Sequence, residues 1–437
     1  MNEGKLSKKN PIATKIVNSQ HENNSHNSTL QDTQVLSKSS YLKDVRLTIV
    51  GGGGIAAIEL PKLARELRRQ GAIVQFFVTE NCLKFIGLDS LRWASQEEVI
   101  IHPTGLAEHI CTADAVIVTP ATADLISKSA NGICSDGATT LIQSALGLKK
   151  TIIFCPTMHE SLGFSPIIEK NKEKLSKLEA VYFTEPRKEE GKDKLPSVDE
   201  LTINICHIIN KRRFFYNNEK NILITLGGTR AMLDPVRCIT NLSTGSLGIE
   251  VAKTFYAMGT HPTILAANTN KEIPNFDSEN TIHLPDYNDM YDYIKELKVS
   301  KYDAFINLVA GSDFLPKSIS HSKISSKSEN LRIDFIRAKK IIDLEHLKKI
   351  PFKIAAKLTS ENEKEGIQIA KELLTNKNLN AVLYSNSSTT WNKKKEHSGV
   401  LITKTNGHIS ETGVKGKKEM ANQFYASFKK FYDDKTD

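Results

Sequence analysis

Short apolar runs alternate with amphipathic stretches along most of the chain. In the first half, apolar runs predict strands at 46–50, 72–79, 115–122 and 151–156. The stretch 56–70 predicts a helix ended by Gly71, with one apolar face formed by Ile58, Leu60, Leu63 and Leu67. Strands that alternate with helices predict a parallel sheet covered by helices on both faces.

The same rhythm restarts after an interruption near residue 210. The segment KRRFFYNNEKN (211–221) is charged and aromatic, which indicates a domain boundary. After it, strands are predicted at 222–229, 261–267, 302–311, 352–358 and 380–386. We therefore expect two doubly wound α/β domains with parallel sheets, at 45–213 and 214–437. Residues 1–44 are polar, and we expect them to form a disordered tail.

Composition narrows the class of protein. The chain has 437 residues, of which 39% are hydrophobic and 25% charged, as in ordinary globular proteins. No apolar run is long enough to span a membrane, and the polar N-terminus lacks the apolar core of a signal peptide, which indicates a cytoplasmic protein. The six cysteines form no CxxC pair, which favours reduced thiols over disulfides or zinc.

The net charge of +9 is spread along the chain among 50 acidic residues. No basic stripe is interleaved with aromatic residues, so the sequence does not indicate nucleic-acid binding. A dispersed positive charge is better suited to attracting small phosphorylated substrates.

Four glycines follow the first predicted strand and precede the first helix, in GGGGIAA (51–57). Glycines let a backbone approach a phosphate closely, and the start of a helix offers free N–H groups. The segment lacks the GxGxxG spacing, and no acidic residue stands where a ribose would need one. It therefore suits a mononucleotide phosphate better than a dinucleotide, or else a tight turn that binds nothing.

A richer segment follows the first strand of the second half, LGGTRAMLDPVRCITNLSTGSLG (226–248). Arg230 and Arg237 bring positive charge, and a small polar turn precedes a helical stretch. Hydroxyls and backbone N–H groups in such a turn can hold a phosphate, although a structural loop with surface arginines is the alternative. The residues that could take part are Gly227, Gly228, Thr229, Asn241, Ser243, Thr244 and Gly245.

From about residue 45 to residue 405 the chain resembles the bifunctional phosphopantothenoylcysteine decarboxylase/phosphopantothenate–cysteine ligase family of coenzyme A biosynthesis. The resemblance rests on ordered motifs: GGGGIAA, AEHI (107–110), VTPATADLISKSANGICSDGATT (118–140), PTMHES (156–161) and GGTRxxxDPVRxITNxSxG. It implies a flavodoxin-like flavoprotein domain followed by a Rossmann-like ligase domain.

In the first half, the resemblance implies an FMN-dependent decarboxylase. GGGGIAA is similar to the family's loop for the flavin phosphate, and 118–140 is similar to its flavin-binding segment. His109 matches the catalytic histidine, a residue type suited to proton transfer near neutral pH; a hydrogen-bonded core histidine is the alternative. The implied cofactor-binding residues are Gly53, Gly54, Ile55, Thr79, Pro120, Ala121, Thr122, Thr140 and Met158.

Two departures from the better-known bacterial form stand out. His159 replaces the asparagine that contacts the substrate carboxylate, and no cysteine occurs between 180 and 200, where that form has its proton donor. The segments PTMHES and EPRKEEGKDK (185–194) instead resemble the archaeal branch of the family. Glu190 and Lys192 lie in the replacing segment, either as substrate contacts or as exposed loop charges, and the proton donor stays open.

In the second half, the resemblance implies a ligase that activates the carboxylate of 4′-phosphopantothenate with CTP or ATP. Asn241 matches the residue that holds the acyl-nucleotide, Lys323 the lysine that neutralises the triphosphate, and Asp313 a carboxylate near nucleotide and Mg²⁺. The other implied nucleotide or substrate positions are Gly228, Thr229, Arg237, Ser243, Thr244, Gly245, Ile354, Lys377 and Asn386. Ile354 and Lys357 stand where the family often has Phe and Glu, and Ser246 where it often has Lys.

The resemblance thus implies ligation of cysteine to 4′-phosphopantothenate, followed by decarboxylation of 4′-phosphopantothenoylcysteine to 4′-phosphopantetheine. Family members form trimers through the flavin domain and dimers through the ligase domain, so a homo-oligomer is expected. Two alternatives remain: a flavin-binding regulatory or structural relative that has lost one or both activities, and a relative that decarboxylates a different cysteine.

Overall fold

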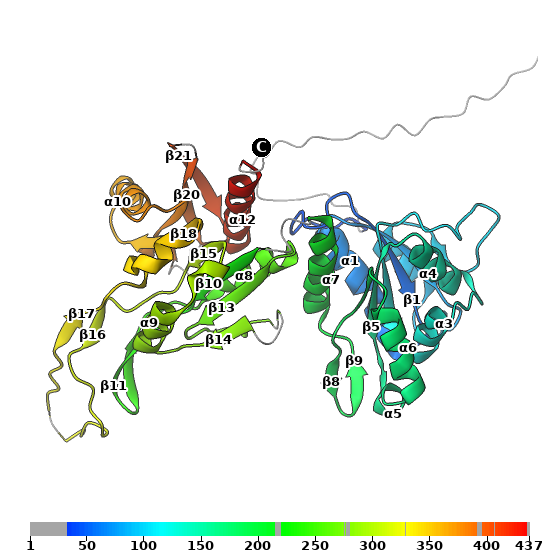
Figure 1. Cartoon of the computed structure of the whole chain (residues 1–437), viewed down its shortest axis with the longest axis horizontal. Helices are drawn as coiled ribbons and strands as arrows, with labels where there is room; N and C mark the ends of the chain where they lie inside the picture. Colours follow the sequence, from blue (N-terminus) through cyan, green and yellow to red (C-terminus); the bar gives the residue numbers. More distant parts are fainter. Residues whose placement is uncertain are drawn as a thin grey trace, which may run out of the picture.

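The computed structural model describes residues 33–214, 220–274, 276, 280–327, 329–390, 396–405 and 407–434. They form two α/β bodies side by side, one before residue 215 and one after residue 219 (Figure 1). The predicted tail lies outside the described residues up to residue 32. Within the described ranges, no helix combines the length and the apolar composition needed to cross a membrane.

A six-stranded parallel sheet forms the centre of the first body, in the order β3-β2-β1-β4-β5-β7. A small antiparallel sheet, β6-β9-β8, stands beside it. The elements, with η for 3-10 helices, are β1 (Arg46–Gly51), η1 (Ile55–Glu59), α1 (Leu60–Arg69), β2 (Ile73–Val78), η2 (Cys82–Lys84), α2 (Leu88–Ser95), β3 (Val99–Ile100), β4 (Ala115–Ala121), α3 (Ala123–Ala130), α4 (Gly137–Gly147), β5 (Thr151–Pro156), β6 (Met158–His159), α5 (Glu160–Gly163), α6 (Pro166–Ser176), β7 (Val181–Phe183), β8 (Arg187–Glu189), β9 (Lys192–Lys194) and α7 (Val198–Arg213).

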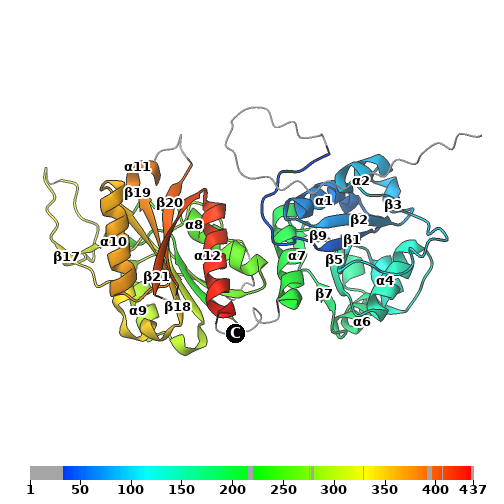
Figure 2. The same cartoon turned by 90° about the horizontal axis from the view of Figure 1, so that it is seen from above.

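Helices cover both faces of this sheet, as the alternating pattern predicts. Strands β4 and β5 are buried along their whole length, which explains their uninterrupted apolar sequence. One face packs against α1, α2 and α7, and the other against α3, α4 and α6 (Figure 2). The doubly wound fold predicted for the first half is confirmed.

The second body is built around an eight-stranded sheet in the order β14-β13-β10-β15-β18-β19-β20-β21. Two hairpins, β11–β12 and β16–β17, project from it. The elements are β10 (Asn221–Leu226), β11 (Arg230–Asp234), β12 (Arg237–Thr240), α8 (Ser246–Ala257), β13 (His261–Ala266), β14 (Thr281–His283), α9 (Tyr287–Glu296), η5 (Val299–Lys301), β15 (Ala304–Asn307), β16 (Phe314–Pro316), β17 (Phe335–Arg337), η6 (Ile341–Asp343), η7 (Glu345–Lys349), β18 (Phe352–Thr359), α10 (Glu363–Asn376), β19 (Ala381–Asn386), α11 (Ser387–Thr390), β20 (Ser398–Thr405), β21 (His408–Lys415) and α12 (Lys417–Asp433).

Six strands of this sheet are parallel, as predicted, but the last two run against their neighbours. Antiparallel strands need only a short connection, whereas parallel strands need a crossover helix. β20 and β21 are joined by such a short connection. In β21 only Val414 is buried, so the strand carries no apolar alternation that would reveal it in the sequence.

Both sheets reverse their strand order beside their first strand, between β1 and β4 and between β10 and β15. In doubly wound sheets, ligands bind outside the carboxyl ends of the strands at such a point. The glycines 52–54 follow β1 directly, and the segment 227–229 follows β10 directly. Both glycine segments therefore lie where this type of fold places its binding site.

Residues 34–44, which we call the strap, pack against both bodies, although the sequence assigned them to a polar tail. Tyr41 and Leu42 are buried. The Tyr41 hydroxyl lies 2.8 Å from Thr254 Oγ1 of α8, and the Tyr41 carbonyl accepts a 3.0 Å hydrogen bond from Asn210 Nδ2 of α7. The tail prediction fails for the strap because two apolar anchors are too few to alter a polar composition.

Helices α7 and α8 face each other between the two bodies, with α12 beside α8 (Figure 2). The rings of His207 on α7 and Tyr256 on α8 stack with 3.9 Å between centroids and 3° between planes. His207 Nδ1 donates to the Tyr256 carbonyl oxygen at 2.8 Å. Burial lowers the pKa of His207 to about 4, so the histidine is neutral in this contact.

Candidate functional sites

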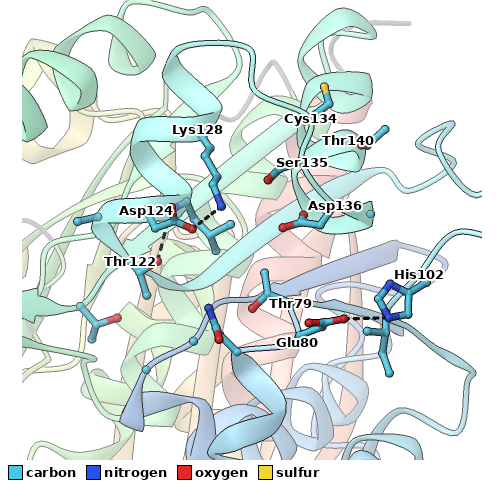
Figure 3. A pocket seen from close by; sticks show the side chains of 18 of the residues that line it. Thr79, Glu80, His102, Thr122, Asp124, Lys128, Cys134, Ser135, Asp136 and Thr140 are labelled. Carbon is cyan, nitrogen blue, oxygen red and sulfur yellow. Dashed lines mark hydrogen bonds and ion pairs between the residues drawn. The ribbon is translucent and has the colours of Figure 1, made fainter.

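A hollow of about 860 Å³ opens at the carboxyl edge of the first sheet, beside the reversal between β1 and β4. We call it the first hollow. Its walls come from the ends of β1, β2 and β4 and from the first turns of α3 and α4 (Figure 3). The predicted residues that line it are Gly53, Gly54, Thr79, Thr122, Thr140 and Met158.

The glycines are needed here for close packing. A Cβ on Gly52 would lie 2.4 Å from the Pro120 carbonyl oxygen, and a Cβ on Gly53 would lie 2.5 Å from the Asn81 Cβ. Any side chain would therefore push the loop away from its neighbours. Because the glycines have no side chains, the loop backbone forms the floor of the hollow, and a ligand can approach the backbone closely.

A carboxylate–histidine contact, an ion pair and a capping group face the first hollow, and the sequence did not single them out. Glu80 Oε1 lies 3.2 Å from His102 Nε2, and Asp124 Oδ2 lies 2.9 Å from Lys128 Nζ (Figure 3). Asp136 caps α4 by accepting from the Thr139 N–H at 2.8 Å. Glu80 could have been found from the rule that residues just after neighbouring parallel strands meet at one edge.

The donor set fits a flavin. Thr157 lines both this hollow and the next, and its buried hydroxyl has no partner among the described residues. A buried hydroxyl without a partner is costly unless a ligand supplies one. Together with the glycine floor and the apolar side chains of Met158 and Leu162, it suits a ring system with polar edges.

A second hollow of about 540 Å³ adjoins the first and shares Gly54, Thr157 and Met158 with it. The β8–β9 hairpin forms one wall and η1 the other. The predicted residues Ile55, Pro120 and His159 line this hollow, together with Glu190 and Lys192 of the hairpin. Ala121 is buried within β4 and lines neither hollow.

His159 is held in one tautomer. It caps α5, and its Nδ1 accepts a 3.1 Å hydrogen bond from the Ser161 backbone N–H. The Ser161 hydroxyl lies 2.9 Å from the same nitrogen. Because a backbone N–H can only donate, Nδ1 must be unprotonated, and the ring proton sits on Nε2. His159 therefore offers an N–H donor to the hollow, as an asparagine side chain would.

The structure does not bring His109 to either hollow of its own chain. His109 is exposed in the loop between β3 and β4, together with Leu106 and Ile110, whose side chains are 84% and 50% exposed. His102 of the same loop lines the first hollow instead.

The loops at the carboxyl edge of the second sheet contact one another closely. A Cβ on Gly228 would lie 3.0 Å from the Asn241 carbonyl oxygen. Asn241 Nδ2 donates to the carbonyls of Ala310 and Gly311, at 2.8 and 3.0 Å. The Ser312 N–H donates to Thr229 Oγ1 at 3.0 Å. The segments 227–229, 241–245 and 310–313 thus form one site, which unites most of the residues predicted for the second half.

Gly245 is confined by its surroundings, since its φ is +69° and a Cβ there would lie 2.6 Å from Thr269 Cγ2. The Thr244 hydroxyl lies 2.8 Å from the Ser246 hydroxyl at the start of α8. The predicted polar turn of Ser243, Thr244 and Gly245 therefore stands at the N-terminus of a twelve-residue helix.

A buried carboxylate, Asp234, joins Lys323 to this region. Burial alone would raise the pKa of Asp234, but backbone N–H donors from Ile324, Val236 and Arg237 lower it below the ordinary value. The Arg237 guanidinium donates a hydrogen bond of 2.9 Å to the Ile324 carbonyl oxygen and lies 3.4 Å from Asp234 Oδ2. Arg237 therefore helps to fix the segment that carries Lys323.

Other predicted positions have mixed outcomes. Asp313 is exposed and lies 3.7 Å from Lys340, and Asn386 ends β19 and donates to the Glu361 carbonyl at 2.7 Å. Ile354 is buried in the core of β18. Lys377 follows α10 at the amino edge of the sheet, opposite the loops above, and pairs with Asp343 at 2.7 Å. A helix between two parallel strands runs back along the sheet, so its end lies at the opposite edge.

Two further kinds of site are relevant in the described part of the chain: metal sites and cysteine thiols. No group of three His, Cys, Asp or Glu side chains there could hold a metal ion. None of the six cysteines forms a disulfide in the described ranges, and Cys134 is exposed at the first hollow.

Comparison with known proteins covers both bodies. Residues 35–210 match the flavoprotein family, and residues 217–431 match the DNA/pantothenate metabolism flavoprotein C-terminal domain. The coenzyme A biosynthesis bifunctional protein CoaBC of Thermococcus kodakarensis is 36% identical over 314 residues, covering 70% of this chain and 76% of the relative. The protein of that name from Methanocaldococcus jannaschii is 32% identical over 358 residues, covering 80% and 86%.

Among solved structures, the C-terminal domain of a coenzyme A biosynthesis bifunctional protein CoaBC is similar, with 24% identity and a TM-score of 0.38. It covers 49% of this chain and 96% of that domain.

Proposed function

Because the chain belongs to the family of coenzyme A biosynthesis bifunctional proteins, we propose that it performs two successive reactions. The second body ligates cysteine to 4′-phosphopantothenate, and the first body decarboxylates the resulting 4′-phosphopantothenoylcysteine to 4′-phosphopantetheine. The observation that carries the proposal is that each sheet presents its own set of ligand-binding loops at its strand-order reversal.

FMN is the cofactor proposed for the first hollow, over the glycine floor and against the Thr157 hydroxyl. When bound, it would take two electrons from the cysteine side chain of the substrate and return them after CO₂ has left. The second hollow adjoins the first and would hold the substrate.

Within that hollow, the Nε2–H of His159 would bind the substrate carboxylate. The apolar side chains of Ile55, Ile58 and Leu195 line the same hollow and would keep water from it. With a single neutral donor and apolar neighbours, the carboxylate would be solvated less well than in water. Its conversion to neutral CO₂ would therefore cost less solvation free energy than in water.

We further propose that His109 acts on a flavin bound by a neighbouring copy of the chain. The support is its place on an exposed loop that also presents Leu106 and Ile110 to solvent. Apolar side chains that are exposed next to one another can be covered by a contact with another protein chain. A homo-oligomer would then be required for decarboxylation.

In the second body, Lys323 would neutralise the triphosphate of CTP or ATP, and Asp313 would share a Mg²⁺ ion with it. A single carboxylate suffices, because Mg²⁺ at such sites is held largely by the substrate phosphates and water. Both Asn241 Nδ2 hydrogens are used by backbone carbonyls, which leaves its Oδ1 as an acceptor for the acyl-nucleotide or the incoming amine.

The division between the two activities is proposed at residues 213 and 214. Helix α7 ends at Arg213 and strand β10 begins at Asn221, and the two family matches meet in the same stretch. A cytoplasmic location is proposed from the small, soluble substrates of the two reactions.

The deciding experiment supplies the purified chain with 4′-phosphopantothenate, cysteine, Mg²⁺ and either CTP or ATP. We expect a yellow protein that makes 4′-phosphopantetheine. Accumulation of 4′-phosphopantothenoylcysteine alone would contradict the decarboxylase half and favour a relative that has lost this activity. A colourless protein that forms neither product would overturn both halves.

A further inference from the structure

The second hollow contains several ionisable side chains: Glu59, His159, Arg187, Glu190, Lys192, Asp193 and Lys194. The decarboxylation proposed above needs one of them to act as an acid, because the carbon that loses CO₂ must afterwards gain a proton. The cysteines of the described chain lie outside this hollow. Within one chain, the candidates for this acid are the side chains just named.

His159 is poorly suited to this task. Its Nδ1 already accepts the Ser161 N–H, so the ring is neutral and carries its only proton on Nε2. Loss of that proton would create an imidazolate anion, which is far too basic to form near neutral pH. His159 can bind the substrate carboxylate but cannot serve as the acid in this arrangement.

The other charged groups are paired or lack a proton to give. Arg187 lies 2.9 Å from Glu189, and an arginine does not release its proton in a protein. Lys194 lies 3.0 Å from Glu190 and 3.4 Å from Glu189. These partners raise the pKa of Lys194, which makes it a weaker acid. The hydrogen bond from Lys194 lowers the pKa of Glu190, which makes this carboxyl group a poor source of a proton near neutral pH.

Lys192 differs from Arg187 and Lys194, the other two cations that line the hollow. In the described part of the chain it forms no ion pair with a carboxylate, and it lines the second hollow. In the antiparallel pair of β6 and β9, Lys192 stands directly opposite His159. Opposite residues share one face of the sheet, with Cβ atoms about 4.5–5.5 Å apart. Its ammonium group can therefore reach the substrate atoms that His159 holds.

We propose that Lys192 is the catalytic acid of the decarboxylase, a role that rests on the function proposed above. Loss of CO₂ leaves an enethiolate, –NH–CH=CH–S⁻. The Lys192 ammonium gives one proton to the carbon next to nitrogen, and the electron pair of the C=C bond forms the new C–H bond. The sulfur charge moves to a C=S bond, which gives –NH–CH₂–CH=S and a neutral amine that water reprotonates. Reduced FMN would supply a hydride to the carbon of the C=S bond, and a proton from water on the sulfur would complete the thiol.

Three full-length variants test this role. Lys192→Met removes the proton and the charge, and Lys192→Arg keeps the charge but has no proton to release. Lys188→Met is the matched control, because Lys188 lies on β8 of the same hairpin and outside the hollow. Retention of yellow FMN in each variant shows that the fold is intact.

Each protein is given a single equivalent of 4′-phosphopantothenoylcysteine, and both CO₂ and 4′-phosphopantetheine are measured. In Lys192→Met and Lys192→Arg we expect CO₂ release close to that of the unmodified chain. Formation of 4′-phosphopantetheine should fall roughly 10²–10⁴-fold, the usual contribution of an acid or base. The flavin should stay bleached, because its electrons find no acceptor. Lys188→Met should behave like the unmodified chain.

Three results would overturn the assignment. Recovery of product by Lys192→Arg would show that charge is enough. Loss of CO₂ release in Lys192→Met would show that Lys192 acts earlier, in binding. Equal product from Lys192→Met and Lys188→Met would show that neither lysine matters. If the unmodified chain itself releases no CO₂, the proposed function fails, which is a separate outcome.

Discussion

The two bodies share a strand order and a glycine turn at the same point, but their sites differ in kind. In the first body the helices α3 and α4 stand back from the strand ends, and a hollow of about 860 Å³ remains. In the second body the loops at the corresponding edge bond to one another through Asn241, Thr229 and Ser312. The elements after the strands, more than the sheet itself, decide whether a doubly wound fold offers a cavity or a network of loops.

This difference suits the ligands that we propose. A cofactor that stays bound through many cycles favours a preformed hollow. Substrates that enter and leave favour loops that can close around them and open again. We therefore expect that each site can be inactivated by mutation without loss of the other activity.

Among the variants that compare the two bodies, the largest effect is expected from Lys323→Ala. Removing the cation proposed for the triphosphate should lower ligation roughly 10²–10³-fold, in line with the loss of one charge-stabilising group. Decarboxylation of added 4′-phosphopantothenoylcysteine should be unchanged. Both rates can be followed by separating the products, with Lys317→Ala as a control on the nearby β16 loop. An equal loss in both variants would remove Lys323 from the site.

Gly53→Val should act on the other half. The first added atom would lie 2.5 Å from the Asn81 Cβ, so the loop must shift. Overpacking of this kind costs about 1–3 kcal/mol, and flavin affinity should fall up to roughly 100-fold while ligation persists. A flavin titration measures the effect. Gly87→Val is the control, because nothing lies within 4 Å of a Cβ on Gly87. Full flavin binding by Gly53→Val would contradict the role of the glycine floor.

His207 should make the contact between the bodies sensitive to acid. Its pKa is about 4 in the fold, against about 6.5 when unfolded. Between these values the unfolded chain binds the extra proton, so the free energy of unfolding falls as the pH drops, by about 3 kcal/mol in all. His207→Gln should remove this part of the pH dependence, measured by urea unfolding at pH 7 and pH 4.5. The control His408→Gln, at an exposed position, should keep the full pH dependence. An unchanged pH dependence of the free energy of unfolding in His207→Gln would contradict the prediction.

The smallest effect is expected at the strap. Tyr41→Phe removes the hydrogen bond to Thr254 and should cost about 1 kcal/mol in thermal or urea unfolding, because the buried Thr254 hydroxyl loses its partner. Thr254→Val combined with Tyr41→Phe should recover part of the loss, since both polar groups are then gone. Additive losses in the double variant would mean that the two hydroxyls do not act as a pair.

The sequence predicted those features that depend on local pattern. The continuous apolar runs of β1, β4 and β5 follow from burial on both faces, and Gly227, with φ of +89°, marks the end of β10. Most site residues were expected from the resemblance to known motifs, and the structure adds that the segments 227–229, 241–245 and 310–313 contact one another.

Features that depend on tertiary contacts were not predicted. β21 is polar because all of its residues except Val414 are exposed, and in the strap only Tyr41 and Leu42 are buried apolar residues. Lys377 is close in sequence to Asn386 but lies at the other edge, because a strand separates them. The exclusion of His159 as an acid needed the position of the Ser161 N–H, which no sequence motif gives.

The strap also limits how the protein can be divided. It precedes the first strand, yet its Tyr41 docks on α8 of the second body, and its Lys43 carbonyl accepts from Arg213 at the end of α7. The two bodies are thus tied at two places, by the chain between α7 and β10 and by this returning segment. If the gene were divided at the domain boundary, each body would be produced without the surface of the other body that it contacts. Exchange of one half between relatives would succeed only if the strap and its docking site were exchanged as a pair.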